Sequence, residues 1–226
     1  MAETISSSEN ALSAPFPWQG AQWTQLSRAF AVKQLAHAYL LSGCEGLGKS
    51  LFADSFARYV LCMKPIVQGA VGRLADTAVA CGSCNNCLKC GVGNHPDILT
   101  IEPEEGSKNI KIDQIRRLSE FVIRSSHSGG AKVVIIQDAH LLNANAANAL
   151  LKTLEEPNDN THVFLVSDHP GRLVATIRSR CQKLAFEVPG ADIAASWLQT
   201  IIGEGNINSI LEASDMRPLI ALQLAE

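Results

Sequence analysis

Short, almost continuously apolar runs alternate along the chain with segments in which apolar residues recur every three or four positions. Runs of the first kind are typical of strands buried on both faces, and the second spacing is typical of amphipathic helices. The runs that predict strands are 38–43, 97–103, 132–138, 161–168 and the end of 175–188. The segments that predict helices between them are 17–36, 50–62, 114–126 (with Asp113 as the expected N-cap) and 145–157. Strands that alternate with helices predict an α/β fold with a mostly parallel sheet covered on both faces.

The stretch GCEGLGKS fits the phosphate-binding pattern G-x-x-x-x-G-K-[ST] at every required position, and it lies between a predicted strand and a predicted helix. Gly43, Gly46 and Gly48 allow successive backbone N–H groups to converge on a phosphate at a helix N-terminus. Lys49 is expected to reach the β- and γ-phosphates, and Ser50 to hold Mg²⁺. The motif therefore predicts a P-loop fold and a candidate site for ATP with Mg²⁺.

The magnesium end of this predicted site is irregular. P-loop ATPases usually end a later strand with an acid that orders Mg²⁺, followed by a Glu that polarises the attacking water. Here the strand reads KVVIIQDAH, so Gln137 takes the place of the metal acid and Asp138 that of the Glu. A shift of one residue makes Asp138 the metal acid and leaves Ala139 in place of the base. Either register predicts slow or absent hydrolysis.

Five of the seven cysteines are clustered, and this predicts a metal site. CGSCNNCLKC places Cys81, Cys84, Cys87 and Cys90 at three-residue steps, with Cys62 upstream. Cys-x-x-Cys loops present thiolates to a tetrahedral Zn²⁺, and a closed four-thiolate site is structural. An iron–sulfur cluster is the chemical alternative. Spacing alone favours the four cysteines of the run. The single cysteines, 44 and 181, are expected to be core or loop residues.

The predicted elements divide the chain into a main domain and a small helical one. Residues 1–14 are rich in Ser, Glu and Asn and predict a mobile tail. We expect the P-loop domain over 15–187, with the cysteine module inserted at about 62–95. Residues 188–226 show only helical spacing and predict a small all-helical domain. The sequence ends inside a helical pattern without a C-cap signal, so we expect a fragment of a longer protein.

The net charge of −3 and the pI of about 6.1 argue against a protein that binds nucleic acid by bulk charge. The basic residues around the third predicted helix could follow a DNA backbone, but a solvated helix face is the preferred interpretation; they are Lys111, Arg116, Arg117 and Arg124. No apolar run approaches the roughly 18 residues that span a bilayer, and no secretory signal is recognisable. We therefore expect a cytoplasmic protein.

AANALLKTLEEP at 146–157, followed by IRSRC at 177–181, resembles the AAA+ clamp-loader family, and within it the delta-prime subunits of bacterial DNA polymerase III. LAHAYLLSG before the P-loop, the cysteines after the first helix, HPD and GGAKVVIIQDAHLL agree with this resemblance, which covers nearly everything from residue 15 onward. It implies an AAA+ domain followed by a helical lid domain. We expect the C-terminal collar domain of the family to be absent from this chain.

The resemblance also implies roles for individual residues. The zinc ligands of the family fall on Cys62, Cys81, Cys84 and Cys87, with Cys90 as an alternative ligand. The Ser-Arg-Cys motif falls on Ser179, Arg180 and Cys181, and its arginine reaches the γ-phosphate of ATP bound to the neighbouring subunit. Arg217 matches the lid arginine that contacts the subunit's own nucleotide, and Ser167 matches the polar sensor at a strand end.

Three functions are therefore open. The resemblance implies a stator subunit in DNA replication, with little ATPase activity of its own, within the nucleotidyltransferase complex of the DNA polymerase III holoenzyme. Its implied partners are the gamma/tau and delta subunits of the clamp loader, with the sliding clamp and primer-template DNA reached through the complex. The alternative is an independent P-loop ATPase with a structural zinc site. A zinc-ribbon nucleic-acid binder, the third, requires tight DNA binding, which the net charge opposes.

Overall fold

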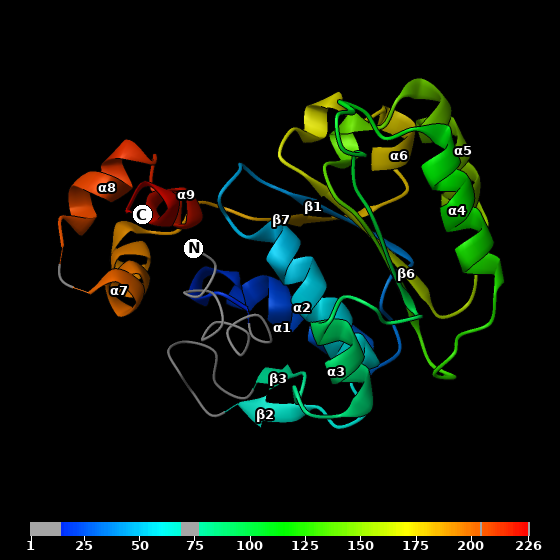
Figure 1. The fold of residues 1–226 in the computed structure, drawn as a ribbon, viewed down its shortest axis with the longest axis horizontal. Coiled ribbons are helices and arrows are strands. Elements are labelled where there is room, and N and C mark those ends of the chain that lie inside the picture. Colours follow the sequence, from blue (N-terminus) through cyan, green and yellow to red (C-terminus); the bar gives the residue numbers. More distant parts are fainter. Residues whose placement is uncertain (1–14, 69–76, 204, 226) are drawn as a thin grey trace.

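A single parallel sheet forms the centre of the molecule (Figure 1). The computed structural model describes residues 15–68, 77–203 and 205–225, so the predicted tail at 1–14 lies outside the described residues. The strand order is β4-β5-β6-β1-β7, and each neighbouring pair is parallel. The strands are β1 (Ala38–Ser42), β4 (Ile98–Ile101), β5 (Lys132–Ile136), β6 (Thr161–Ser167) and β7 (Gln182–Ala185). The predicted α/β fold with a mostly parallel sheet is confirmed.

Helices cover both faces of this sheet. They are α1 (Gly20–Ala31), α2 (Lys49–Leu61), α4 (Ile112–Ile123), α5 (Ala144–Glu155) and α6 (Ala175–Arg178). In the part of the chain that the structure describes, the short 3-10 helices are η3 (Pro17–Gln19), directly before α1, η4 (Ala139–Leu141), before α5, and η5 (Pro170–Arg172), before α6. Figure 1 shows α1 and α2 on one side of the strands and α4 and α5 on the other. Both faces of every central strand are therefore buried, which explains the unbroken apolar runs in the sequence.

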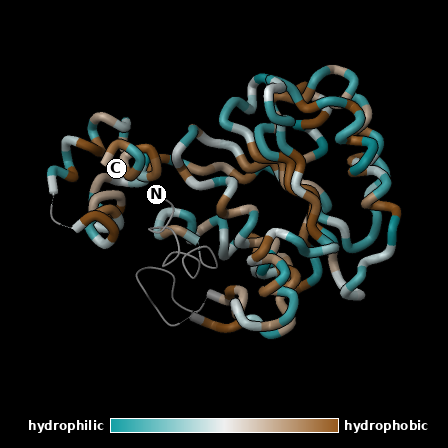
Figure 2. Tube along the Cα trace, in the orientation of Figure 1, coloured by the Kyte–Doolittle hydropathy of each residue, from teal (hydrophilic) through white to brown (hydrophobic). Residues whose placement is uncertain are grey.

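Alternate residues of the central strands enter two separate cores. Leu40 of β1 packs with α4 and α5, whereas its neighbours Tyr39 and Leu41 pack with the aromatic side chains of α1 and α2. In the second core, Trp23 packs edge-on against Phe52, with ring centroids 5.6 Å apart. The hydropathy of the trace is highest along these strands (Figure 2). The period-two alternation of strand side chains thus produces two cores from one sheet.

The start of α4 differs from the prediction. Its N-cap is Lys111 and not Asp113, which lies inside the first turn and is paired with Arg116 at 2.7 Å. The backbone N–H of Lys111 donates instead to the side chain of Gln114, at 3.0 Å. A buried glutamine three residues into the helix provides this contact, so the helix begins before the aspartate.

Three helices form the C-terminal part, here called the lid: α7 (Ala191–Ile202), α8 (Ile207–Ala213) and α9 (Pro218–Ala225). Ala194, Leu198, Leu211 and Ala221 make a small core of their own. The lid also contacts the start of the described chain, because Trp197 of α7 meets Phe16 and Trp18 with ring centroids 5.5 and 5.1 Å away. Two segments distant in sequence are thereby joined by an aromatic cluster beside the P-loop.

A small module follows α2 and holds most of the cysteines. It contains the antiparallel pair β2 (Ile66–Gln68) and β3 (Thr77–Val79) and the helix α3 (Asn85–Gly91). The Asn86 side chain donates to the carbonyl of Leu61 at 2.9 Å, and the indole of Trp23 donates to Ala78 at 3.0 Å. These contacts fix the module against α2 and α1. Within the described residues, no helix combines the length and the apolar character needed to cross a membrane.

Asp97, in the HPD segment before β4, anchors the loop that leads from α4 to β5. Its fully buried carboxylate accepts hydrogen bonds from the backbone N–H groups of His127 and Ser128, at 2.7 and 2.9 Å, and from the hydroxyls of Ser126 and Ser128. Burial on its own raises the pKa of Asp97, but these hydrogen bonds outweigh it and hold the pKa below its usual value. The ionised carboxylate therefore stabilises the fold.

Replacing Asp97 with Asn is expected to lower the free energy of unfolding by about 2 kcal/mol, because at this buried position the amide turns a donor toward the N–H of Ser128. The pKa of this carboxyl is lower in the folded than in the unfolded protein. Its contribution to the free energy of unfolding is therefore complete above the unfolded pKa of about 4 and is lost as the pH falls through the lower folded pKa. Urea unfolding from pH 3 to 7 measures this. Asp113→Asn is the matched control, because Asp113 is exposed and pairs with Arg116 at the surface. Its expected change in the free energy of unfolding is below about 0.5 kcal/mol. Equal effects of the two substitutions would contradict the anchor.

Candidate functional site

The P-loop lies where the sequence motif predicts, between β1 and α2. Gly43 follows β1 directly, and an added Cβ there would lie 2.4 Å from the carbonyl oxygen of Phe186. Gly48 is the N-cap of α2 and has a φ of 75°, in the left-handed region. Within the described residues, the backbone N–H groups of Gly48 and Lys49 have no acceptor in the protein. They remain available to an anion at the helix N-terminus.

The outer side of the P-loop is covered by two other parts of the chain. Gly46 packs under α9, where the N–H of Leu219 donates to the Gly46 carbonyl at 3.2 Å. Gly48 lies under Phe16, whose ring would be 2.6 Å from a Cβ at this position. The Gln19 side chain donates to the carbonyls of Leu47 and Gly48, at 2.9 and 3.1 Å. Both glycines are thus required by the fold itself, apart from any phosphate.

Lys49, the first residue of α2, is held by the protein. Its Nζ lies 2.5 Å from Oδ1 of Asp168 and donates to the carbonyl of Cys44 at 2.6 Å. The Lys49 side chain is only 3% exposed, and that of Asp168 is 25% exposed. The ammonium that a nucleotide phosphate needs is therefore already paired with a carboxylate.

At the end of the site where the sequence predicts magnesium, Ser50 is paired with Gln137. The Ser50 hydroxyl donates to the side-chain carbonyl of Gln137 at 2.7 Å, so Gln137 stands opposite the P-loop serine. Asp138 has a left-handed φ of 47° and caps η4. Of the two registers that the sequence left open, this geometry matches the one with Gln137 in the place of the metal acid. A neutral amide supplies an oxygen ligand without the charge that Mg²⁺ prefers.

Ser167 ends β6 and is fully buried, with its hydroxyl 3.4 Å from Nδ1 of His140. Burial lowers the pKa of His140. Arg217, immediately before α9, donates from Nε to the carbonyl of Ser214 at 2.8 Å, and its Cβ lies against Gly46. Both residues are therefore close to the P-loop region, Ser167 through the strand next to β1 and Arg217 through the lid.

The Ser-Arg-Cys motif lies at the end of α6, where its three side chains have different environments. Arg180 is paired with Glu155 at 2.6 Å and donates to the carbonyl of Thr176 at 3.0 Å, while 35% of its side chain stays exposed. Ser179 donates to the same Thr176 carbonyl, at 3.0 Å. Cys181 is buried in the core shared with α4 and α5, and burial raises the pKa of its thiol to about 11. The arginine thus reaches the surface while the cysteine holds the turn in place.

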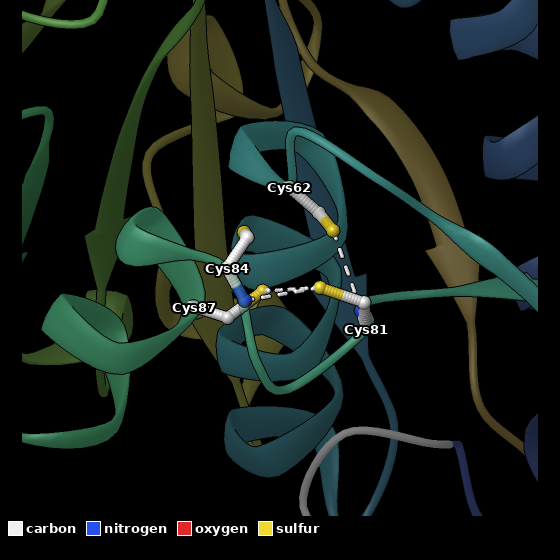
Figure 3. A group of neighbouring side chains, drawn as sticks. All are labelled: Cys62, Cys81, Cys84 and Cys87. Atoms are coloured by element: carbon white, nitrogen blue, oxygen red, sulfur yellow. Dashed lines mark hydrogen bonds between the residues drawn. The ribbon is translucent and has the colours of Figure 1, made fainter.

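Four cysteines converge on one space (Figure 3). Cys62 follows α2, Cys81 and Cys84 precede α3, and Cys87 lies on it; their sulfur atoms are all within 4.8 Å of one another. The spacing-only choice of the sequence, which replaced Cys62 by Cys90, does not match this arrangement. Because α3 is packed against α2, the end of α2 delivers a thiol that no local spacing reveals.

These four thiols fit a tetrahedral metal ion. Zinc–sulfur bonds of about 2.3 Å place the sulfurs of such a site about 3.8 Å apart, and Cys81 Sγ lies 3.9 Å from Cys87 Sγ. Hydrogen bonds from the backbone and hydroxyl of Ser83, and then from the backbone of Cys84, lower the pKa of the Cys81 thiol to about 6. Sulfur-directed N–H groups of this kind favour the thiolate that a metal requires.

Cys90 lies outside this group. It is buried three residues beyond Cys87 on α3, where it lines a cavity of about 450 Å³ together with Asp54, Arg58 and His95. Burial raises the pKa of its thiol to about 11. A neutral, buried thiol is suited to packing.

Comparison with known proteins identifies the family to which a chain with this site belongs. A family model described as DNA polymerase III, delta subunit, matches residues 18–189. The chain is 42% identical over 213 residues to the DNA polymerase III subunit delta' of Pseudomonas aeruginosa, with 92% of this chain and 61% of the relative covered. The chain belongs to the family of DNA polymerase III delta-prime subunits. The Escherichia coli delta' subunit is 35% identical over 211 residues, with 92% and 60% covered.

Solved structures support the same fold for this delta-prime family member. A DNA polymerase III gamma subunit-related protein from Thermotoga maritima aligns with a TM-score of 0.54 and 21% identity, covering 89% of this chain and 57% of the other. A variant of RuvB from the same organism aligns with a TM-score of 0.51 and 15% identity, covering 91% and 58%. The chain spans about 60% of the length of the curated delta-prime relatives that it matches.

Sequence reasoning missed several residues of this delta-prime site. The sequence places Asp168 only at the end of a predicted strand, although a carboxylate that directly follows Ser167 is a signal, since the carboxyl ends of parallel strands meet at one edge. Nothing in the AANALLKTLEEP segment itself links Glu155 to Arg180. Gln19 and Phe16 have no signal, because their contacts with the P-loop depend on how the chain folds back.

Proposed function

We propose that this chain acts as a clamp-loader subunit of the bacterial replicative DNA polymerase and donates Arg180 to ATP bound by a neighbouring subunit. The observation that carries this proposal is the placement of Arg180. Its guanidinium is partly exposed and is oriented by Glu155, and its polar contacts within the described residues are with Glu155 and the Thr176 carbonyl, away from this chain's own P-loop motif in the sequence. Guanidinium suits the role because it is always charged and can contact phosphate oxygens in a bidentate manner.

The same proposal assigns little hydrolysis to the chain itself. The Ser50 hydroxyl is opposite Gln137, so the acid that normally orders Mg²⁺ is replaced by an amide. Lys49 is paired with Asp168. We propose that the P-loop holds a nucleotide weakly, with Arg217 and Ser167 beside it, and that turnover belongs to the adjacent subunit. These contacts also argue against the independent ATPase, which needs a competent metal acid.

We further propose that Cys62, Cys81, Cys84 and Cys87 hold one structural Zn²⁺. The four sulfurs lie within 4.8 Å of one another, and four thiolates on one tetrahedral ion would leave no open position for catalysis. The ion would connect the end of α2 to α3.

The proposed partners are the gamma/tau and delta subunits of the clamp loader, with the sliding clamp and primer-template DNA reached through the complex. Support comes from the family of the chain and from its 31% identity, over 184 residues, to the DNA polymerase III subunit tau of Escherichia coli. The net charge of −3 fits a subunit that meets DNA through its complex.

Reconstitution tests this function. A protein that contains this chain, mixed with tau/gamma and delta subunits, is expected to raise ATP turnover in the presence of clamp and primed DNA, because it completes a neighbouring ATP site. Phosphate release and size-exclusion chromatography measure turnover and assembly. Assembly without any rise in turnover would contradict the proposed role.

A further inference from the structure

Asp168 stands at the mouth of the P-loop because of the sheet register. Ser167 of β6 pairs with Ser42 of β1, so the residues that follow them, Asp168 and Gly43, leave the same edge of the sheet side by side. Asp168 is therefore positioned by two central strands and not by a loop of free conformation. Its carboxylate is directed at the first residue of α2.

The pairing of Lys49 with this carboxylate is close and shielded. Nζ of Lys49 is 2.5 Å from Asp168 and 2.6 Å from the Cys44 carbonyl, and only 3% of its side chain is exposed. A phosphate oxygen that needs this ammonium must displace Asp168 or share Lys49 with it. The Asp168 side chain keeps 25% of its surface exposed.

We propose that Asp168 competes with the terminal phosphate of a nucleotide for Lys49 and thereby keeps the affinity of the P-loop for nucleoside triphosphates low. The carboxylate occupies one donor of the ammonium and adds a negative charge beside the phosphates. In P-loops this lysine reaches the β- and γ-phosphates, so the competition acts more strongly on a triphosphate than on a diphosphate. Asp168 is thus a specificity-determining residue of the P-loop.

Binding of fluorescent ATP and ADP analogues with Mg²⁺ to the isolated chain tests this proposal. Asp168→Asn keeps an oxygen for Lys49 but removes the charge. It is expected to tighten ATP binding by about tenfold or more, with a smaller gain for ADP. Asp159→Asn, at an exposed position before β6, is the matched control and is expected to leave both affinities unchanged. Adding Lys49→Ala to Asp168→Asn is expected to abolish the gain.

An affinity for ATP that is unchanged or weaker in Asp168→Asn, or undetectable in both proteins, would overturn the proposal. So would a gain of equal size in Asp159→Asn. Thermal unfolding verifies that each variant is folded, and Asp168→Ser replaces the asparagine variant if that one is not. The inference rests on the P-loop part of the proposed function. Because it is measured without partner subunits, its failure leaves the test of Arg180 intact, and the converse also holds.

Discussion

Replacing Arg180 with Ala is expected to lower ATP hydrolysis at the neighbouring site of the assembled complex by about 10³-fold or more, the range found for arginine fingers. The developing charge on the γ-phosphate loses its guanidinium partner, while the fold keeps its core. The side chain is partly exposed, and its pairs with Glu155 and the Thr176 carbonyl lie at the surface. Its loss should therefore cost little stability. Single-turnover phosphate release from the complex, with ATP bound before DNA is added, measures the effect.

Two further variants make this result specific. Arg178→Ala removes a neighbouring arginine from the same short helix and is expected to leave turnover unchanged. Arg180→Lys keeps the charge but loses the bidentate contact, so only a small part of the activity should return. Complexes must contain the same amount of each variant chain. Full turnover with Arg180→Ala in such complexes would exclude an arginine finger at this position.

Replacing Cys87 with Ser is expected to remove the metal ion and to unfold the module formed by β2, β3 and α3. Zinc binding contributes roughly 10 kcal/mol or more to folding in small zinc domains, and a site with three ligands retains only part of this. Cys87 is a buried member of the four-cysteine group. Metal analysis of the purified wild-type chain should give one zinc per chain, and the variant should contain almost none and should unfold at a lower temperature.

Cys90→Ser is the control for this experiment. Cys90 lies on the same helix but outside the four-cysteine group, so full metal content is expected. Loss of metal from Cys90→Ser together with retention in Cys62→Ser would show that the spacing-only set is correct. Iron in place of zinc would overturn the assignment of the ion.

The parts of the molecule that depend on local pattern could be predicted from the sequence. The continuous apolar runs identified the buried parallel strands, and the glycine-rich motif identified the strand–turn–helix that contains Lys49. Contacts between distant segments could not be predicted. The pair of Lys49 with Asp168 depends on the register of β6 against β1. The place of Cys62 among the thiols follows from the packing of α3 on α2, and only the family resemblance indicated it. At the start of α4, the preference of Asp113 for the N-cap position is overridden, because the Gln114 side chain accepts the hydrogen bond from the N–H of Lys111.

The stacked rings of Phe16 and Trp18, with centroids 4.9 Å apart, have a consequence for how the C-terminal helices can move. These helices are attached to the rest of the protein by the chain that follows β7, by the contact of Trp197 with both rings, and by the hydrogen bond from Leu219 to the Gly46 carbonyl. Since the Trp18 indole also donates to the Leu47 carbonyl at 3.0 Å, the second attachment ends on the P-loop itself. Movement of the three helices away from the sheet would therefore break the aromatic contact of Trp197 and loosen the P-loop at the same time. A shortened protein that begins after Trp18 would lose this restraint while keeping the whole sheet.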